Sequence, residues 1–272
     1  MITSEKRKKF LKRLLFVPRC AGCGIRLSPI ARDDNLSYGK VCICPECMQK
    51  WQTAKRDMCH TCFLPAGECT CTNINRKIKQ PFIPSLFFYH QNRASVQNRV
   101  IFSAKTRHYP ELFEFLSLEL APHIERLIKD KGVGRDDCIL TWLPRSRASV
   151  KKYGHDQAKM LCLELSRTLG IASLPLLIRK GGKEQKKLDN KKRASNIESS
   201  VFLNEKLLGV NIGRKSRKSL NISELIEGKT IIVIDDIITT GASMRRAILL
   251  LEPQKPASVL TACVARCEIK SK

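Results

Sequence analysis

The sequence predicts an α/β protein in which a parallel sheet flanked by helices follows a small N-terminal cysteine-rich module. Nine of the thirteen cysteines lie between residues 20 and 71, strand-like apolar runs alternate with helical runs after residue 84, and one apolar run ends in two adjacent aspartates. The 272 residues suit a main domain with an appendage. We therefore assign residues 1–76 to the cysteine-rich module, with a helix at its start, and residues 77–272 to the α/β domain.

The chain begins with a basic segment that predicts a short helix. Phe10, Leu11, Leu14 and Leu15 fit one face of that helix. The apolar run at residues 14–17 is too short for a signal peptide, and no run approaches the roughly 20 residues needed to cross a bilayer. We expect a cytoplasmic protein without membrane insertion, whose first helix packs on its own protein. A membrane-surface helix is the alternative.

The cysteines of the module come in pairs that are typical of metal ligands. Three pairs have the CxxC spacing and a fourth has the CxC spacing. A CxxC turn directs two sulfurs at one ion, and two such turns complete a tetrahedron. In a reducing compartment this pattern predicts zinc, with disulfides as the alternative. We expect one zinc ribbon with zinc held by Cys20, Cys23, Cys44 and Cys47, and a second zinc held by Cys59, Cys62, Cys69 and Cys71.

Two further side chains leave the ligand sets open. Cys42 lies near enough in sequence to replace a neighbour in the first site, and His60 lies near enough to do so in the second. A module with few apolar residues needs metal to fold, so structural zinc is the default role and contact with nucleic acid or protein is the alternative. The isolated cysteines are interpreted as small buried apolar residues: Cys138, Cys162, Cys263 and Cys267.

After a charged linker at residues 73–84, the pattern alternates between strands and helices. Short apolar runs predict strands at residues 85–89, 138–143, 230–234 and 257–265. Apolar residues with helical spacing predict helices at residues 111–129, 157–169 and 243–251. Gly170 ends the second of these helices and Pro253 ends the third. Strands that alternate with helices indicate a parallel sheet.

The stretch IIVIDDIITTGAS at residues 231–243 is the strongest functional signal. Its first four residues are apolar and fit a central parallel strand that is buried on both faces. Asp235 and Asp236 follow at the carboxyl end of that strand, where open α/β sheets bind ligands. Residues 239–243 form a turn whose glycine, hydroxyls and free amides attract phosphate. The segment thus offers acids for sugar hydroxyls beside a phosphate site, with a solvated loop as the alternative.

A second group of polar residues follows the strand at residues 138–143 and so lies at the same edge of the sheet. These residues suit a pyrophosphate group, with a salt-bridged surface loop as the alternative. They are Pro144, Arg145, Ser146 and Arg147. The lysine-rich segment 179–196 is interpreted either as a mobile cationic lid over a phosphate-rich ligand or as a solvated charge run.

Residues 231–243 resemble the fingerprint of type I phosphoribosyltransferases, in which hydrophobic residues and two acids precede Thr-Gly. The resemblance implies a type I phosphoribosyltransferase-like sheet that binds phosphoribosyl pyrophosphate (PRPP), or a related nucleotide, with Mg²⁺. It also implies that Asp235 and Asp236 hold the ribose 2- and 3-hydroxyls. By the same resemblance the 5-phosphate is held by Thr239, Thr240, Gly241, Ala242 and Ser243.

A cysteine-paired module joined to such a domain resembles the ComF family, which is named for DNA uptake in competent bacteria. The segment LPRSRASVKKYGHDQA at residues 143–158 is similar to a segment of that family. It fits the family at Pro144, Gly154 and Gln157. It departs from the family at Tyr153, His155 and Asp156. These departures weaken any transfer of base or acceptor recognition.

The resemblance to the ComF family continues on both sides of that segment. Lys105 stands where a lysine follows the family's first helix. The family pattern Q-x-x-L…R-x-x-N…F is matched by Gln185, Leu188, Arg193, Asn196 and Phe202. The resemblance thus adds Lys105, Gln185, Arg193 and Asn196 to the predicted pyrophosphate loop and lid.

Two classes of function remain open. One is transfer of phosphoribose from PRPP to an unknown acceptor. The catalytic residues for this transfer stay unknown, because no general base is evident in the sequence. A lone histidine such as His155 is more often structural. The other is a non-catalytic competence factor that grips single-stranded DNA or recruits a motor protein through its zinc ribbons and basic loops. The net charge of +25 favours a polyanionic partner, and the intact acids favour PRPP binding.

Overall fold

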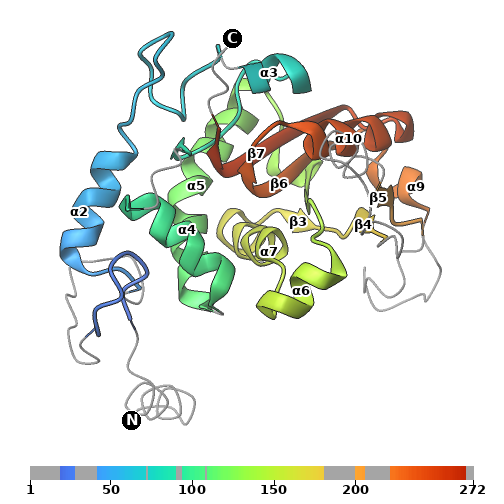
Figure 1. Cartoon of the computed structure of the whole chain (residues 1–272). Helices are drawn as coiled ribbons and strands as arrows, with labels where there is room; N and C mark the ends of the chain where they lie inside the picture. Colours follow the sequence, from blue (N-terminus) through green and yellow to red (C-terminus); the bar gives the residue numbers. More distant parts are fainter. Residues whose placement is uncertain are drawn as a thin grey trace, which may run out of the picture.

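The computed structural model describes residues 19–27, 42–71, 73–89, 94–107, 109–180, 200–205 and 221–267. Figure 1 shows a central sheet with helices on both sides, and helix α2 (Pro45–Ala54) of the N-terminal module beside α4 (Val96–Thr106). Within these ranges, no helix is both long enough and apolar enough to span a membrane.

Within the described ranges, the main sheet has five strands, and every neighbouring pair is parallel. The predicted α/β class with a parallel sheet flanked by helices is therefore confirmed. The sheet order is β1 (Phe87–Phe88), β7 (Ser258–Arg266), β6 (Thr230–Ile238), β2 (Cys138–Trp142) and β3 (Ala172–Ser173). The other helices of the described ranges are α3 (Asn73–Ile78), α5 (Pro110–Asp130), α6 (Arg147–Tyr153), α7 (Gln157–Leu169), α9 (Ile222–Ile226) and α10 (Ala242–Leu251), with short 3-10 turns η1 (Arg135–Asp137) and η3 (Glu252–Gln254).

Strand β6 is buried on both faces, as its apolar run predicts. Ile232 and Ile234 belong to the core cluster that includes apolar residues of α5 and α7. Ile231 and Val233 belong to the cluster that includes residues of α3, α9 and α10. The two sets separate because successive side chains of a strand point to opposite faces of the sheet. Helices thus cover both faces of β6.

Strand β6 is longer than predicted, since it ends at Ile238 instead of residue 234. The additional residues pair with β7, in which Asp235 lies opposite Cys263 and Ile238 lies opposite Arg266. The two aspartates therefore lie inside the last part of the strand and not directly after it. Their backbone is held by the sheet, which fixes the positions of both carboxylates.

The segment at residues 73–84, expected as a linker, contains helix α3 and forms part of the core. Ile74 and Ile78 are buried against α10. Gln80 is also buried, and its Oε1 accepts a hydrogen bond of 2.7 Å from the backbone N–H of Thr261. The expected boundary between residues 76 and 77 falls within α3. The segment was not predicted as a helix because its lysines and arginine outnumber the single apolar i, i+4 pair formed by Ile74 and Ile78.

A small antiparallel hairpin formed by β4 (Leu177–Arg179) and β5 (Val201–Leu203) packs near α10. It was not predicted, because strands of three residues show too little alternation to be distinguished from a loop. Two predicted features lie outside the described residues: the N-terminal helix around residues 10–15, and the part of the predicted lid that contains Gln185, Arg193 and Asn196.

Candidate functional site

Two carboxylates near the end of β6 form the centre of the site. Asp235 and Asp236 are both partly buried. The backbone N–H of Asp236 donates to Asp235 Oδ1 at 2.8 Å, and the N–H of Ile237 donates to Asp236 Oδ1 at 2.9 Å. These bonds fix one oxygen of each carboxylate. The other oxygens are left for cations, hydroxyl groups or a neighbouring side chain.

Asp236 is paired with Arg145, whose Nη2 donates to Asp236 Oδ2. The two side chains are 15% and 22% exposed, respectively. Arg145 follows strand β2, which lies next to β6 in the sheet. The structure therefore brings together the predicted acid pair and the predicted pyrophosphate segment. It also shows that one acid already has a cationic partner, which a ligand must displace or share.

Asp235 has the most perturbed carboxyl group of the site. Burial, and then the negative charge of Asp236, raises the pKa of Asp235 well above its usual value, although Arg145 opposes this shift. The side chain thus resists ionisation in the absence of a ligand. A bound cation or a set of donating hydroxyl groups would compensate its charge.

The turn after β6 leads into the uncapped start of helix α10. Thr239 and Thr240 are exposed, whereas Gly241 is buried and adopts a left-handed conformation with φ 75° as the N-cap residue. No side chain caps the helix, and the N–H of Ala242 makes only a long contact of 3.4 Å with Thr240 Oγ1. The first amides of a helix lack intrahelical partners and attract anions. Together with the partly buried Ser243, the turn can hold a phosphate group.

The segment after β2 is held by an aspartate that sequence reasoning treated only as a departure from the family. Asp156 Oδ2 accepts the backbone N–H of Arg145 at 2.8 Å, and Asp156 also caps α7. Ser146 caps α6 by accepting the N–H of Ser149, so its hydroxyl has a structural role here. Pro144 is partly buried and Arg147 is exposed at the first position of α6. An aspartate directly before a predicted helix was the available signal for Asp156.

Lys105 lies in the last turn of α4, and the segment around His155 holds that helix end. Gln157 Nε2 donates to the carbonyl oxygen of Lys105 at 3.1 Å, and His155 Nε2 lies 2.8 Å from the carbonyl oxygen of Ala104. The Lys105 ammonium stands 5.6 Å from the ring centroid of Tyr153. His155 is buried, and its two ring nitrogens lie 3.0 and 2.8 Å from backbone carbonyl oxygens, which fits the expected structural role.

Arg179 is a site residue that sequence reasoning did not single out. It ends β4, and its Nε donates to Ser200 Oγ at 3.0 Å. Burial lowers the pKa of Arg179, and the negative charge of Asp235 opposes this shift. Its position as the first residue of the lysine-rich segment was the only sequence signal. Gln185, Arg193 and Asn196 of that segment lie outside the described residues.

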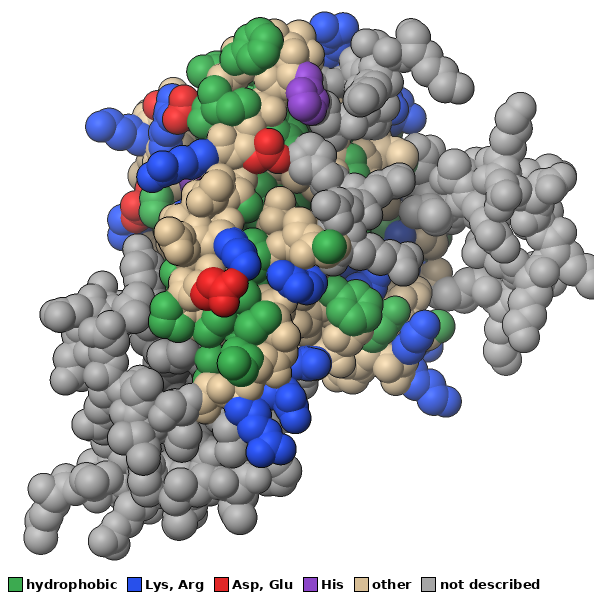
Figure 2. All heavy atoms as spheres, turned by 60° about the vertical axis from the view of Figure 1, so that its left-hand side comes forward, with side chains coloured by type: hydrophobic (Ala, Val, Ile, Leu, Met, Phe, Trp, Pro, Cys, Tyr) green, Lys and Arg blue, Asp and Glu red, His purple; other side chains and the backbone are tan. Residues whose placement is uncertain are grey.

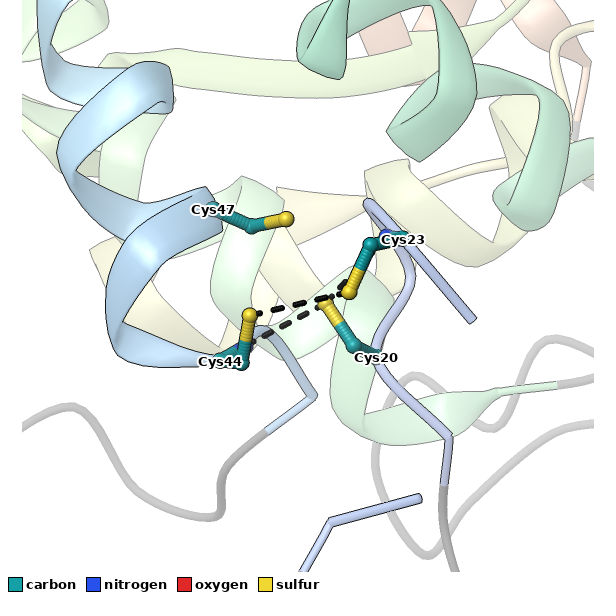
Figure 3. A group of neighbouring side chains, drawn as sticks. All are labelled: Cys20, Cys23, Cys44 and Cys47. Carbon is teal, nitrogen blue, oxygen red and sulfur yellow. Dashed lines mark hydrogen bonds between the residues drawn. The ribbon is translucent and has the colours of Figure 1, made fainter. Parts of the chain in front are cut away.

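The first set of predicted zinc ligands converges at the start of α2 (Figure 3). Each of Cys20, Cys23, Cys44 and Cys47 has its sulfur within 4.8 Å of the others. Cys23 Sγ and Cys44 Sγ are 3.7 Å apart, near the spacing of about 3.8 Å that tetrahedral Zn–S bonds of about 2.3 Å require. Burial alone would raise the pKa of Cys20, but N–H groups of the two turns outweigh it and lower the pKa to about 7. This donor set fits a zinc ion.

The second set, formed by Cys59, Cys62, Cys69 and Cys71, also has its sulfurs within 4.8 Å of one another. Cys71 Sγ lies 3.3 Å from Cys59 Sγ and 3.5 Å from Cys69 Sγ. Burial tends to raise the pKa of Cys62, but hydrogen bonds from the backbone N–H of Leu64 and from the other three cysteines together outweigh it and lower the pKa. The four-sulfur set is therefore suited to a metal cation.

The two alternative ligands lie outside both four-sulfur groups. Burial raises the pKa of Cys42 to about 12, which keeps it a neutral thiol. His60 is exposed, and neither group includes it. Three of the isolated cysteines are buried, as expected, and Cys267 is partly buried.

Residues 173–271 match the family model of the phosphoribosyl transferase domain, which supports a phosphoribosyltransferase-type domain in this part of the chain. A search among curated proteins gave no match.

The chain is similar to solved structures that include the following three. The crystal structure of an adenine phosphoribosyltransferase is 20% identical over 58% of this chain and 71% of its own, with a TM-score of 0.35. A hypoxanthine phosphoribosyltransferase from Trypanosoma cruzi, in a ternary substrates complex, is 16% identical over 60% of this chain and 74% of its own, with a TM-score of 0.33. An allosteric regulatory enzyme of purine biosynthesis is 15% identical over 60% of this chain, which spans only 30% of that enzyme, with a TM-score of 0.33.

Proposed function

We propose that the chain binds PRPP with Mg²⁺ at the carboxyl edge of β2 and β6 and transfers phosphoribose to an acceptor. One observation carries the proposal: the acid pair, Arg145 and the uncapped start of α10 lie around the same sheet edge. Asp235 and Asp236 would bind the ribose hydroxyls, and residues 239–243 would bind the 5-phosphate. We extend the proposal to a ComF-type protein that acts in DNA uptake, with zinc at both cysteine clusters.

The basic residues have a defined task in the proposed reaction. The acceptor forms a bond to the anomeric carbon of ribose, and the bond from that carbon to pyrophosphate breaks, so that pyrophosphate leaves with the electron pair. Mg²⁺ would supply charge neutralisation on the pyrophosphate and the ribose hydroxyls. Arg145 would move from Asp236 to the leaving group, and Lys105 and Arg147 would add positive charge beside it. This exchange also frees Asp236 to bind a ribose hydroxyl.

Calorimetric titration of the zinc-loaded chain with PRPP and Mg²⁺ tests the proposal. Wild-type protein should bind, and Asp235→Asn with Asp236→Asn should weaken binding at least about tenfold, because hydrogen bonds to charged groups contribute roughly 1.5–3 kcal/mol each. Asp130→Asn, an exposed acid at the end of α5, serves as the control and should bind normally. Unchanged affinity of the double variant would show that the acids do not hold the ligand.

A second candidate function, contact with nucleic acid, is supported by charge. The net charge is +25, and Figure 2 shows Lys and Arg side chains distributed over the face that carries the N-terminal module, with fewer acidic side chains between them. We propose single-stranded DNA as the polyanion. Its affinity should fall steeply with salt, with a slope of about −2 in log–log form for three phosphate contacts. An affinity that does not change with salt would exclude this candidate.

The zinc module also exposes apolar side chains that suit a protein partner such as a motor protein. Phe63 is 70% exposed and Met58 is 45% exposed. Both line a surface hollow of about 530 Å³ that also contacts Arg56 and Asp57. Exposed apolar groups rimmed by charges are typical of protein contacts. Phe63→Ser should abolish co-purification of such a motor if this surface recruits it, and an intact complex would exclude the surface.

A further inference from the structure

A fully buried arginine joins the second cysteine cluster to the main sheet. Arg266, the last residue of β7, has no exposed surface. Its guanidinium donates to the carbonyl oxygens of Ala66 and Cys69, at 2.5 and 2.8 Å, and to Asn75 Oδ1 at 2.9 Å. It also stands 5.2 Å from the ring centroid of Phe88. One side chain therefore contacts the cysteine loop, helix α3 and strand β1.

Among the described residues, the buried charge of Arg266 has no carboxylate partner. Within the described residues it has only neutral hydrogen-bond acceptors, and its Nε has no partner there. A buried cation is strongly destabilising unless it is paired. The guanidinium donates directly to the carbonyl oxygen of Cys69, one of the four cysteines of the second cluster. Since four thiolates around one Zn²⁺ carry a net charge of about −2, the metal-loaded cluster is the counter-ion that favours this buried position.

Arg266 also lies beside the start of the predicted phosphate-binding turn. It is paired in register with Ile238, the residue directly before Thr239. The backbone N–H of Cys267 donates to the carbonyl oxygen of Ile238 at 2.8 Å. Displacement of Arg266 would therefore disturb the end of β6 at Ile238, where the turn at residues 239–243 begins.

Helix α3 provides a second connection between the same cluster and the same turn. It begins two residues after the ligand Cys71 and carries Asn75, which binds Arg266. A Cβ added to Gly241 would lie 3.4 Å from Ile78 Cγ2 and 3.7 Å from Ile74 Cγ2. The backbone of the turn thus rests directly on α3.

The first cysteine cluster makes a different set of contacts and offers an internal comparison. Ser103 Oγ of α4 donates to the carbonyl oxygen of Ala21 at 2.8 Å. Trp51, at the other end of α2, donates to Glu119 of α5 at 2.8 Å. This cluster therefore anchors the module to α4 and α5.

We propose that metal at the second cluster, acting through Arg266 and α3, holds the turn at residues 239–243 in its phosphate-binding conformation. Arg266 is then a positioning residue for the anion. The anion part of this inference rests on the proposed function of the turn, whereas the conformational part does not.

Two cysteine variants of the full chain test the proposal. Cys62→Ser and Cys23→Ser should each lower the zinc content by one ion per chain. Cys62→Ser should weaken ribose 5-phosphate binding by about fivefold or more, a usual size for coupling between two sites, whereas Cys23→Ser should leave it nearly unchanged. Hydrogen exchange of residues 239–243, measured without ligand, should become faster in Cys62→Ser only.

Two substitutions test Arg266 itself. Arg266→Met should weaken ribose 5-phosphate binding and speed hydrogen exchange of residues 239–243 as Cys62→Ser does. Arg266→Lys keeps the charge, so it should partly restore the slow exchange of these residues. If Cys62→Ser does not fold, Asn75→Ser removes the bond from α3 to Arg266, together with the bond from Asn75 Nδ2 to the carbonyl oxygen of Pro81, and carries the same expectation. Wild-type protein that fails to bind ribose 5-phosphate would overturn the proposed function, while the exchange measurement would still test the coupling. Equal exchange and equal affinity in Cys62→Ser and Cys23→Ser would overturn the coupling.

Discussion

Ionisation of the partly buried Asp235 destabilises the unliganded protein, and a bound ligand would offset this loss. Burial, and then the charge of Asp236, raises its pKa in the folded state, so the unliganded protein loses stability as pH rises from the usual pKa of an aspartate toward the folded-state pKa. Asp235→Asn should therefore stabilise the unliganded protein at neutral pH by about 0.5–2 kcal/mol. The gain should be smallest near pH 4 and grow with rising pH.

Denaturant unfolding of both proteins at several pH values measures this difference. The same variant should bind PRPP more weakly, so that stability and binding change in opposite directions. A variant that is less stable than wild type at neutral pH would show that the carboxylate has a structural partner in the folded protein.

Gly241 is required for two separable reasons. Its φ of 75° disfavours any side chain, and an added Cβ would contact Ile78 of α3. Gly228 has a similar φ of 71° but nothing within 4 Å of an added Cβ, so Gly228→Ala isolates the backbone contribution. Both substitutions should cost about 1 kcal/mol or more in unfolding free energy. Only Gly241→Ala should also weaken ribose 5-phosphate binding in calorimetry, and equal affinities would remove the turn from the site.

At the scale of elements, helix α2 is docked on α5 through a buried carboxylate. Glu119 accepts from Trp51 Nε1 at 2.8 Å and pairs with Lys55 at 2.6 Å, while its side chain is only 3% exposed. Glu119→Ala removes both contacts and leaves a buried indole N–H without its partner. We expect a loss of about 2–3 kcal/mol in unfolding free energy.

The matched control is Glu125→Ala on the same helix. Glu125 pairs with Arg135 at the surface, where both side chains are about half exposed, so its removal should cost under about 1 kcal/mol. Denaturant midpoints of the two variants provide the measurement. Similar losses would mean that the buried pair does not anchor α2.

Elements with long apolar runs were predictable, and elements fixed by tertiary contacts were not. Strand β6 was recognised from four consecutive apolar residues, but its last four residues are strand only because β7 pairs with them. Helix α3 lies in a charged segment, and the two buried isoleucines of the helix can be recognised as core residues only because α10 packs against them. The acid pair and both cysteine sets came from local spacing. Asp156 joins the site through a hydrogen bond to the backbone of Arg145, eleven residues earlier in the chain, which a single sequence does not reveal.

The whole molecule is stabilised by a core that crosses the expected domain boundary. One core cluster contains Cys20, Cys47 and Trp51 of the cysteine-rich module together with residues of α5, α7 and the sheet. The buried Arg266 makes a second connection of this kind at the other cysteine cluster. Because apolar burial and metal ligation involve the same residues, we expect the module and the sheet to stabilise each other.

Removal of the metal tests this mutual stabilisation across the whole chain. The purified protein should contain two zinc ions and unfold in one calorimetric transition, because the shared core leaves neither part complete alone. A ligand present at about 1,000 times its dissociation constant stabilises by about 4 kcal/mol per site, so a strong chelator that removes zinc from both sites should lower Tm by roughly 16–32 °C for a chain of this size. A chelator of the same charge that does not bind zinc is the control. Two separate transitions, of which only one responds to the chelator, would show that the cysteine-rich module folds independently of the sheet.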